Sequence, residues 1–201
     1  METRKDKLVS NMTETFRTEI LNTATELFRE KGLKFTMQDV AASMHVAKKT
    51  IYKLYPSKED LLMDLVKTGF DRIQDAKRRV LESDRSMKEK IAAVLIAMPD
   101  NYRSLDFRRL KGIEEKYPEV SDEIQRRLET EWEPILELLE EGQRNGSVRA
   151  ISLPVLKQIV TSAIDSFMYS DALQSAGVSY QEALDEMVGI LMKGVWNDSA
   201  E

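Results

Sequence analysis

The chain of 201 residues contains no cysteine and a single histidine, and these two shortages exclude much of the chemistry available to a protein. Without cysteine it can form neither a disulfide framework nor a thiolate metal site. One histidine, His45, leaves almost no material for a histidine-based metal site or a catalytic triad. We therefore expect no metal and no cofactor.

Long apolar segments and phosphate-binding loops are missing as well. No apolar run reaches the length of a membrane span, and the N-terminal residues Met-Glu-Thr-Arg-Lys-Asp-Lys lack an apolar signal core. A glycine-rich phosphate loop and a serine–histidine pairing are also absent, so an enzyme is not expected. These features predict a cytoplasmic protein with no membrane partner.

Negative charge predominates, but it is unevenly distributed. The whole chain has a formal net charge of −5. Residues 1–60 hold 11 basic and 9 acidic side chains, net +2, whereas residues 61–201 hold 19 and 26, net −7. Phosphate binding depends on the local electrostatic field. A mildly basic segment (residues 1–60) followed by an acidic one (residues 61–201) is therefore compatible with DNA binding, but it is not evidence for it.

The periodicity of the apolar residues predicts an all-α fold of about nine helices. No stretch shows the sustained alternation of a β-strand. The expected helices include those near residues 13–31, 37–44, 48–54, 57–82, 119–144, 153–174 and 179–195. Pro134 predicts a kink or a restart inside the fifth of these.

Residues 36–60 are the most informative segment. Thr36 and Asp39 have the spacing of an N-terminal capping box, and Tyr55-Pro56 ends the second short helix. Helices this short do not form alone in water, because helix nucleation is costly. The segment must therefore pack on the amphipathic helix that precedes it.

The second short helix presents Lys48, Lys49, Thr50, Tyr52 and Lys53 on the side away from Ile51. Lysine can donate to guanine O6 and N7, and the threonine methyl group can contact a thymine methyl group. A solvated charged face is the alternative interpretation. Within two helices joined by a tight turn, the pattern favours a helix that enters a DNA groove.

These residues carry a resemblance to the DNA-binding region of TetR-family transcriptional repressors. The matching positions across residues 17–61 are Arg17, Ile20-Leu21, Ala24, Leu27-Phe28, Gly32, Thr36, Val40-Ala41, Val46, Lys48, Thr50-Ile51-Tyr52, Tyr55 and Pro56 to Leu61. The resemblance implies a three-helix helix-turn-helix head (residues 1–60) and a helical ligand-binding and dimerisation bundle (residues 61–201). Beyond Leu61 it is only architectural.

Three positions depart from the family pattern. His45 stands where the family usually has a turn glycine, so we expect a left-handed backbone there. Ala47 replaces a common serine, which removes one phosphate or cap contact, and Lys49 replaces a small residue. Ala47 and Lys49 nevertheless remain in the predicted DNA-contact set.

Three further residues, Thr36, Tyr55 and Lys58, are candidates for DNA contact. Thr36 can cap its helix, bind phosphate or do both, and Lys58 is either a phosphate ligand at a helix N-terminus or a surface lysine. The resemblance implies that Tyr52 and Tyr55 brace the helix while their hydroxyls reach phosphates; otherwise they are core aromatics.

The resemblance also implies a ligand pocket in the body and a dimer interface made by the last two helices. The pocket candidates, for which plain core is the alternative and Arg108 can equally be a surface residue, are Met98, Tyr102, Phe107, Arg108, Trp132, Phe167 and Met168. The last two helices have apolar arcs too broad for one core-facing stripe, which favours a second copy of the chain as partner. The interface candidates are Ile159, Ala163, Phe167, Leu184, Val188, Leu191 and Val195.

The predicted function is a homodimeric repressor that binds a palindromic operator on double-stranded DNA and is released by a small-molecule effector. The alternative is a ligand-independent regulator or activator of the same fold that works through a protein partner. A non-specific DNA-organising protein is disfavoured by the net acidity.

Overall fold

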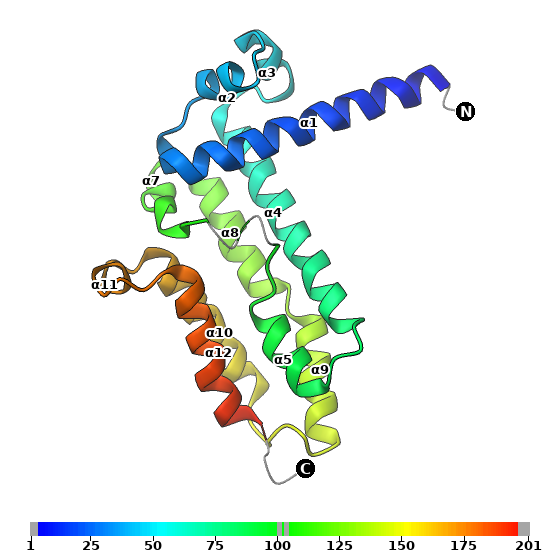
Figure 1. Ribbon diagram of the computed structural model, residues 1–201, viewed down its shortest axis with the longest axis vertical. Coiled ribbons are helices and arrows are strands. Elements are labelled where there is room, and N and C mark those ends of the chain that lie inside the picture. Colours follow the sequence, from blue (N-terminus) through cyan, green and yellow to red (C-terminus); the bar gives the residue numbers. More distant parts are fainter. Residues whose placement is uncertain (1–3, 100–101, 103–104, 197–201) are drawn as a thin grey trace. The chain divides into compact units, whose positions relative to one another are not determined.

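The computed structural model describes residues 4–99, 102 and 105–196, with side chains from residue 13 onward. Its elements are α1 (Arg4–Lys31), the 3-10 helix η1 (Gly32–Lys34), α2 (Met37–Ser43), α3 (Lys48–Leu54), α4 (Lys58–Leu81), α5 (Met87–Leu95), the 3-10 helix η2 (Phe107–Leu110), α7 (Ile113–Lys116), α8 (Pro118–Thr130), α9 (Glu133–Arg144), α10 (Leu153–Tyr169), α11 (Asp171–Ser175) and α12 (Tyr180–Val195). The all-α prediction is confirmed (Figure 1). None of the helices in these ranges is long and apolar enough to cross a membrane.

The chain divides into two compact units. The first comprises Met1–Thr68 and Gly112–Ser121, and the second comprises Gly69–Lys111 and Asp122–Glu201. The first unit therefore extends past the expected boundary at residue 60 and also includes α7. Helix α4 is continuous and contributes residues to both units.

The core of the first unit forms around α1, on which α2 packs, while α3 packs on α2. Val40 of α2 and Ile51 of α3 are completely buried. The residues of α1 that line the core recur at helical spacing: Ile20, Leu21, Ala24, Leu27 and Phe28. Tertiary packing thus supplies the stability that two seven-residue helices lack on their own.

Local hydrogen bonds fix both ends of α2. The Thr36 hydroxyl accepts from the amide of Asp39 at 3.1 Å, and the Asp39 carboxylate accepts from the Thr36 amide at 2.7 Å, so the predicted capping box is confirmed. After α2, His45 has a φ of 55°, which confirms the expected left-handed turn.

The Asp39 carboxylate is also bonded to the Lys31 ammonium at the end of α1, at 2.8 Å. The bonds from Lys31 and Thr36 lower the pKa of Asp39 to about 2. This residue therefore caps α2 and ties it to α1 in its charged form.

A cluster around Asp64 of α4 joins three helices of the first unit. Arg17 of α1 donates to both carboxylate oxygens of Asp64, with the Nε bond at 2.7 Å, and to the Thr68 hydroxyl at 3.2 Å. The Tyr55 hydroxyl, at the end of α3, donates to the same carboxylate. Burial tends to raise the pKa of Asp64, but the bonds from Arg17 and Tyr55 hold it below its usual value.

The second unit is built from paired helices. Helix α5 packs on α9 and α12, and α10 packs on α12 and η2. The predicted helix over 119–144 is two helices, α8 and α9, with Trp132 as the N-cap residue of α9 and Pro134 in its first turn. Proline tolerates that position because the first-turn N–H groups have no intrahelical partner, so Pro134 restarts the helix.

The helix predicted over 153–174 is interrupted. Helix α10 ends at Tyr169, and the Ser170 hydroxyl accepts from the Leu173 amide at 3.2 Å to begin the short α11. The last helix begins with a capping box between Ser179 and Glu182 and ends at Val195, close to the predicted end.

We predict that Asp64→Asn lowers the free energy of unfolding by about 2 kcal/mol, because it removes a charged acceptor shared by Arg17 and Tyr55. Urea denaturation followed by circular dichroism measures this. Glu14→Gln is the matched control, because it removes the exposed second partner of Arg17 and should change stability by less than about 0.5 kcal/mol. Equal effects of the two variants would contradict the assigned role of Asp64.

The stability contributed by Asp39 should depend on pH. Its pKa is about 2 in the folded chain against an ordinary 3.8, so its contribution is complete above 3.8 and disappears as the pH falls through 2. We predict that Asp39→Asn is less stable than the parent at pH 6 and that the difference shrinks between pH 4 and about 2. Thermal unfolding at a series of pH values measures it; a constant difference would contradict the prediction.

Candidate nucleic-acid interface

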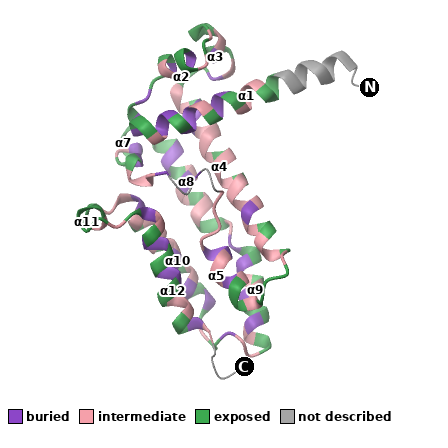
Figure 2. Ribbon diagram, in the orientation of Figure 1, coloured by how far each residue is buried: buried purple, intermediate pink, exposed green. Residues whose placement is uncertain are grey.

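Helix α3 buries one side and exposes the other, as its sequence predicts. Ile51 is completely buried, whereas Lys48, Lys49 and Lys53 are exposed and Tyr52 is 37% exposed (Figure 2). Thr50 is half-buried at the edge of the exposed face. A rigid, anchored helix thus presents three cations and an aromatic ring to solvent.

The three lysines of α3 are not neutralised by the protein. None of their ammonium groups forms an ion pair with a residue that the structure describes. The Lys48 ammonium lies 5.3 Å from the centre of the Tyr52 ring, one helical turn away, which holds this side chain along the helix. Such a face can donate to phosphate oxygens and to guanine in the major groove.

The start of each short helix differs in its capping. Ala47 is the exposed N-cap residue of α3 and has no side chain that can cap it. Thr36 is exposed at the start of α2, but its hydroxyl proton is donated to Asp39 at 2.8 Å. The structure therefore shows Thr36 in the capping role.

Tyr55 lies in the core rather than on the surface. It is 4% exposed, and its hydroxyl donates to Asp64. Burial and the neighbouring Asp64 carboxylate raise the pKa of Tyr55, so the hydroxyl keeps its proton. The phosphate contact expected of Tyr55 does not fit this placement, because the donor is already used inside the protein.

Lys58 also differs from the expectation. Its ammonium group donates to the carbonyl oxygens of Leu33 and Phe35, both at 2.6 Å, and lies 4.4 Å from the centre of the Phe35 ring. Burial, together with the neighbouring Lys116, lowers the pKa of Lys58. The side chain therefore holds the start of α4 to the α1–α2 connection instead of extending towards a phosphate.

The sequence-based interpretation missed Asp64 and Thr68. Both lie on the same side of α4 as the buried Leu61, three and seven residues further along the helix. Polar residues at core-facing positions signal a buried hydrogen-bond partner, and Arg17 at the matching face of α1 supplies it. That signal was available in the periodicity.

The predicted pocket residues of the second unit are dispersed. Tyr102 accepts from Arg72 at 3.2 Å, and the indole N–H of Trp132 donates to the Leu128 carbonyl at 2.9 Å. Tyr102, Trp132 and Met168 are buried, and Phe167 is half-buried. Buried placement is compatible with both the core and the pocket interpretation, so the ligand role of these residues stays a prediction.

The remaining pocket candidates have other neighbours. The Phe107 ring packs against Tyr180 with centroids 5.1 Å apart, and Arg108 donates to Asp106 at 2.6 Å and to the Val178 carbonyl at 3.4 Å. Met98 lines a hollow of the surface, together with Arg79 and Arg85.

The predicted dimer residues divide between the inside and the outside of the second unit. Leu184, Val188 and Val195 are buried in the protomer, whereas Ile159 is 51% exposed. Ala163, Phe167 and Leu191 are half-buried. The large apolar side chains that α10 and α12 expose most are Val155, Ile159 and Ile190. Periodicity did not separate the two faces, because both carry apolar residues.

Comparisons with known proteins extend this picture. A family model described as bacterial regulatory proteins, tetR family, matches residues 20–65. The chain is 24% identical over 180 residues to an uncharacterized HTH-type transcriptional regulator, YvaF, of Bacillus subtilis (strain 168), covering 89% of this chain and 95% of that protein.

Two solved structures are similar over most of the chain. One is a transcriptional regulator of the TetR/AcrR family from Thermobifida fusca YX-ER1, with a TM-score of 0.63, 25% identity, and coverage of 90% and 98% of the two chains. The other is a putative transcriptional regulator from Saccharomonospora viridis in complex with choline, with a TM-score of 0.70, 16% identity, and coverage of 92% and 99%.

The family match contains α2, α3 and the start of α4, so it coincides with the segment that exposes the lysines. The similarity of fold continues through the second unit. The chain belongs to the TetR family, a non-enzymatic family, and is a helix-turn-helix, DNA-binding transcriptional regulator.

Proposed function

We propose that this regulator is a repressor that acts as a homodimer on a palindromic operator and is released by a small-molecule effector. The observation that carries the proposal is the exposed face of α3, where Lys48, Lys49 and Lys53 have no acidic partner among the described residues. In this proposal residues 1–60 read DNA, residues 61–201 bind the effector and dimerise, and the protein works in the cytoplasm.

The contacts on DNA divide by chemistry. Lys48, Lys49 and Thr50 reach base edges, and Tyr52 and Lys53 bind phosphates. Ala47 and Thr36 approach the backbone closely at the starts of the two helices. Tyr55 and Lys58 position the reading helix from inside the unit, since their polar groups are bonded to Asp64 and to two backbone carbonyls.

The dimer rests on the outer face of α10 and α12. The Arg149 amide donates to the Val195 carbonyl at 3.0 Å, which places the residues before α10 beside the end of α12. Ile159 and Ile190 then lie within about 15 Å of that junction along their helices, at a rise of about 1.5 Å per residue. Three exposed aliphatic side chains on one helix pair favour burial against a second copy.

Release follows from differential affinity. An effector that binds better to one arrangement of the second unit weakens operator binding by that difference in affinity. Helix α4 provides the connection, because it begins at Lys58 in the first unit and ends at Leu81 in the second.

Selection from random DNA tests operator binding. We expect the protein to select a palindrome of roughly 15–30 base pairs whose half-sites lie one or more helical turns apart. Failure to select any palindrome at low salt would sink the proposal.

Single substitutions on α3 test the reading face. Lys48→Ala and Tyr52→Ala should each weaken operator binding by about tenfold or more, as expected for loss of one good base or phosphate contact. Lys111→Ala is the matched control, because Lys111 is exposed and pairs only with exposed Asp171 among the described residues. Fluorescence anisotropy measures binding; an equal loss in Lys48→Ala and Lys111→Ala, with none in Tyr52→Ala, would mean that net charge alone matters and would contradict the assigned face.

We predict that Ile190→Glu and Ile159→Glu shift the protein to monomer, because each places a charge in the proposed interface. Sedimentation equilibrium measures the mass. Ala172→Glu adds the same charge at an exposed position of α11 and should leave the dimer intact. A monomeric parent protein, or dimers in all variants, would contradict this interface.

A further inference from the structure

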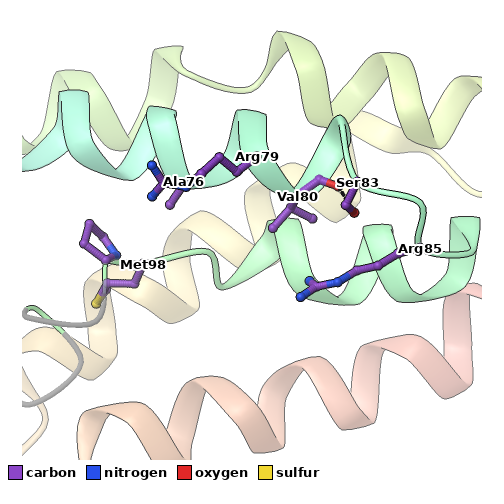
Figure 3. Close-up of a pocket in the computed structure, with 7 residues that line it drawn as sticks. Ala76, Arg79, Val80, Ser83, Arg85 and Met98 are labelled. Carbon is purple, nitrogen blue, oxygen red and sulfur yellow. Dashed lines mark hydrogen bonds between the residues drawn. The ribbon is translucent and has the colours of Figure 1, made fainter.

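The surface of the second unit has a hollow of about 260 Å³, lined by α4 and by the segments that precede and follow α5 (Figure 3). Arg79 and Val80 of α4 form one wall, Arg85 lies in the turn that leads to α5, and Met98 and Pro99 follow α5. One water molecule occupies about 30 Å³ in the liquid, so the hollow can accept a group of several heavy atoms.

The two arginines of the hollow are exceptional in this chain. Of the arginines whose side chains the structure describes, Arg79 and Arg85 are the two with no hydrogen bond or ion pair. Arg78, their neighbour on α4, pairs with Asp75. Two unpaired guanidinium groups in one hollow are therefore not a general feature of the surface.

The rest of the lining is mostly apolar. Ala76 is 8% exposed, and Val80, Met98 and Pro99 are half-buried. The Ser83 hydroxyl donates to the Val80 carbonyl at 2.6 Å, so its proton is used within α4 (Figure 3). The free donors of the hollow are thus the two guanidinium groups, and they stand beside an apolar surface.

We infer that this hollow binds an amphipathic organic anion. Its carboxylate or phosphate monoester end meets Arg79 and Arg85, because the planar guanidinium group matches both anions with paired hydrogen bonds. Its apolar remainder lies on Val80, Met98 and Pro99. A cation is repelled by the two arginines, and a neutral apolar molecule leaves them without a partner.

The position of the hollow connects it to regulation. Ala76, Arg79 and Val80 belong to α4, the helix whose first residue, Lys58, is bonded to the carbonyl groups of Leu33 and Phe35. An anion bound here contacts the helix that also holds the DNA-reading unit. This regulatory consequence rests on the proposed function, whereas binding of the anion does not.

The binding test uses octanoate and octyl phosphate as probes, with octanol, octyltrimethylammonium and inorganic phosphate as comparisons. We expect the two octyl anions to shift the methyl resonance of Met98, labelled with carbon-13 and assigned through Met98→Leu. Arg79→Gln with Arg85→Gln should weaken this binding by about tenfold or more, as expected for loss of charge-assisted bonds. Arg78→Gln, which removes the same charge one residue away from Arg79, should not.

Several results would overturn the inference. They are equal affinity of the parent and the double variant, equal binding of octanol or octyltrimethylammonium, and binding of inorganic phosphate as tight as that of octyl phosphate, which means an adventitious ion only. Circular dichroism of the double variant checks that it is folded, and the single variants give the share of each arginine.

Operator binding in the same samples separates this inference from the proposed function. A selected palindrome without arginine-dependent probe binding overturns the anion site and leaves the repressor. Arginine-dependent probe binding without any selected palindrome supports the site and overturns the repressor. If both hold, octanoate should weaken operator binding by the parent and not by the double variant.

Discussion

The position of α3 depends on one carboxylate. Asp64 of α4 accepts from Arg17 of α1 and from Tyr55 at the end of α3, so a single side chain sets the relation of three helices. Helix α3 has seven residues and no side-chain cap, and thus has little stability of its own. The lysines of α3 form no ion pair with a described residue that could hold the helix in position. Its position is fixed from the opposite side, where Ile51 is buried and the Tyr55 hydroxyl donates to Asp64.

Lys58 complements this arrangement at the beginning of α4. Its ammonium group donates to the carbonyl groups of Leu33 and Phe35, and it lies 4.4 Å from the centre of the Phe35 ring and 5.6 Å from the centre of the Tyr117 ring. A cation that is satisfied by carbonyls and aromatic faces needs no carboxylate. Lys58 and Asp64 together attach the start of α4 to the rest of the first unit at two points six residues apart.

The sequence predicted local features better than partners. The capping box of Thr36 and Asp39, the left-handed turn at His45 and the bounds of α3 follow from interactions within a few residues, and all three are confirmed. The family resemblance implies a phosphate contact for Tyr55, and the position of Lys58 in the first turn of a helix favours one for Lys58. Their bonds run to Asp64 and to Leu33 and Phe35, between 9 and 25 residues away, and periodicity does not encode such pairings. The two apolar faces of α12 were not separable for the same reason.

Unpaired cationic side chains occur in two regions, α3 and the hollow beside α4, and their residue type differs between the two. On α3 the unpaired groups are lysines, whose flexible ammonium groups can adjust to phosphates and guanines along a groove. In the hollow beside α4 they are arginines, whose rigid planar groups favour paired bonds to one carboxylate or phosphate. In a chain with a net charge of −5, acidic side chains pair with many of the other described arginines, such as Arg17, Arg78 and Arg126. The charge of Arg85 helps to lower the pKa of Glu89, but neither Arg79 nor Arg85 forms an ion pair with a described residue, which leaves their donors available to an anion from outside the protein.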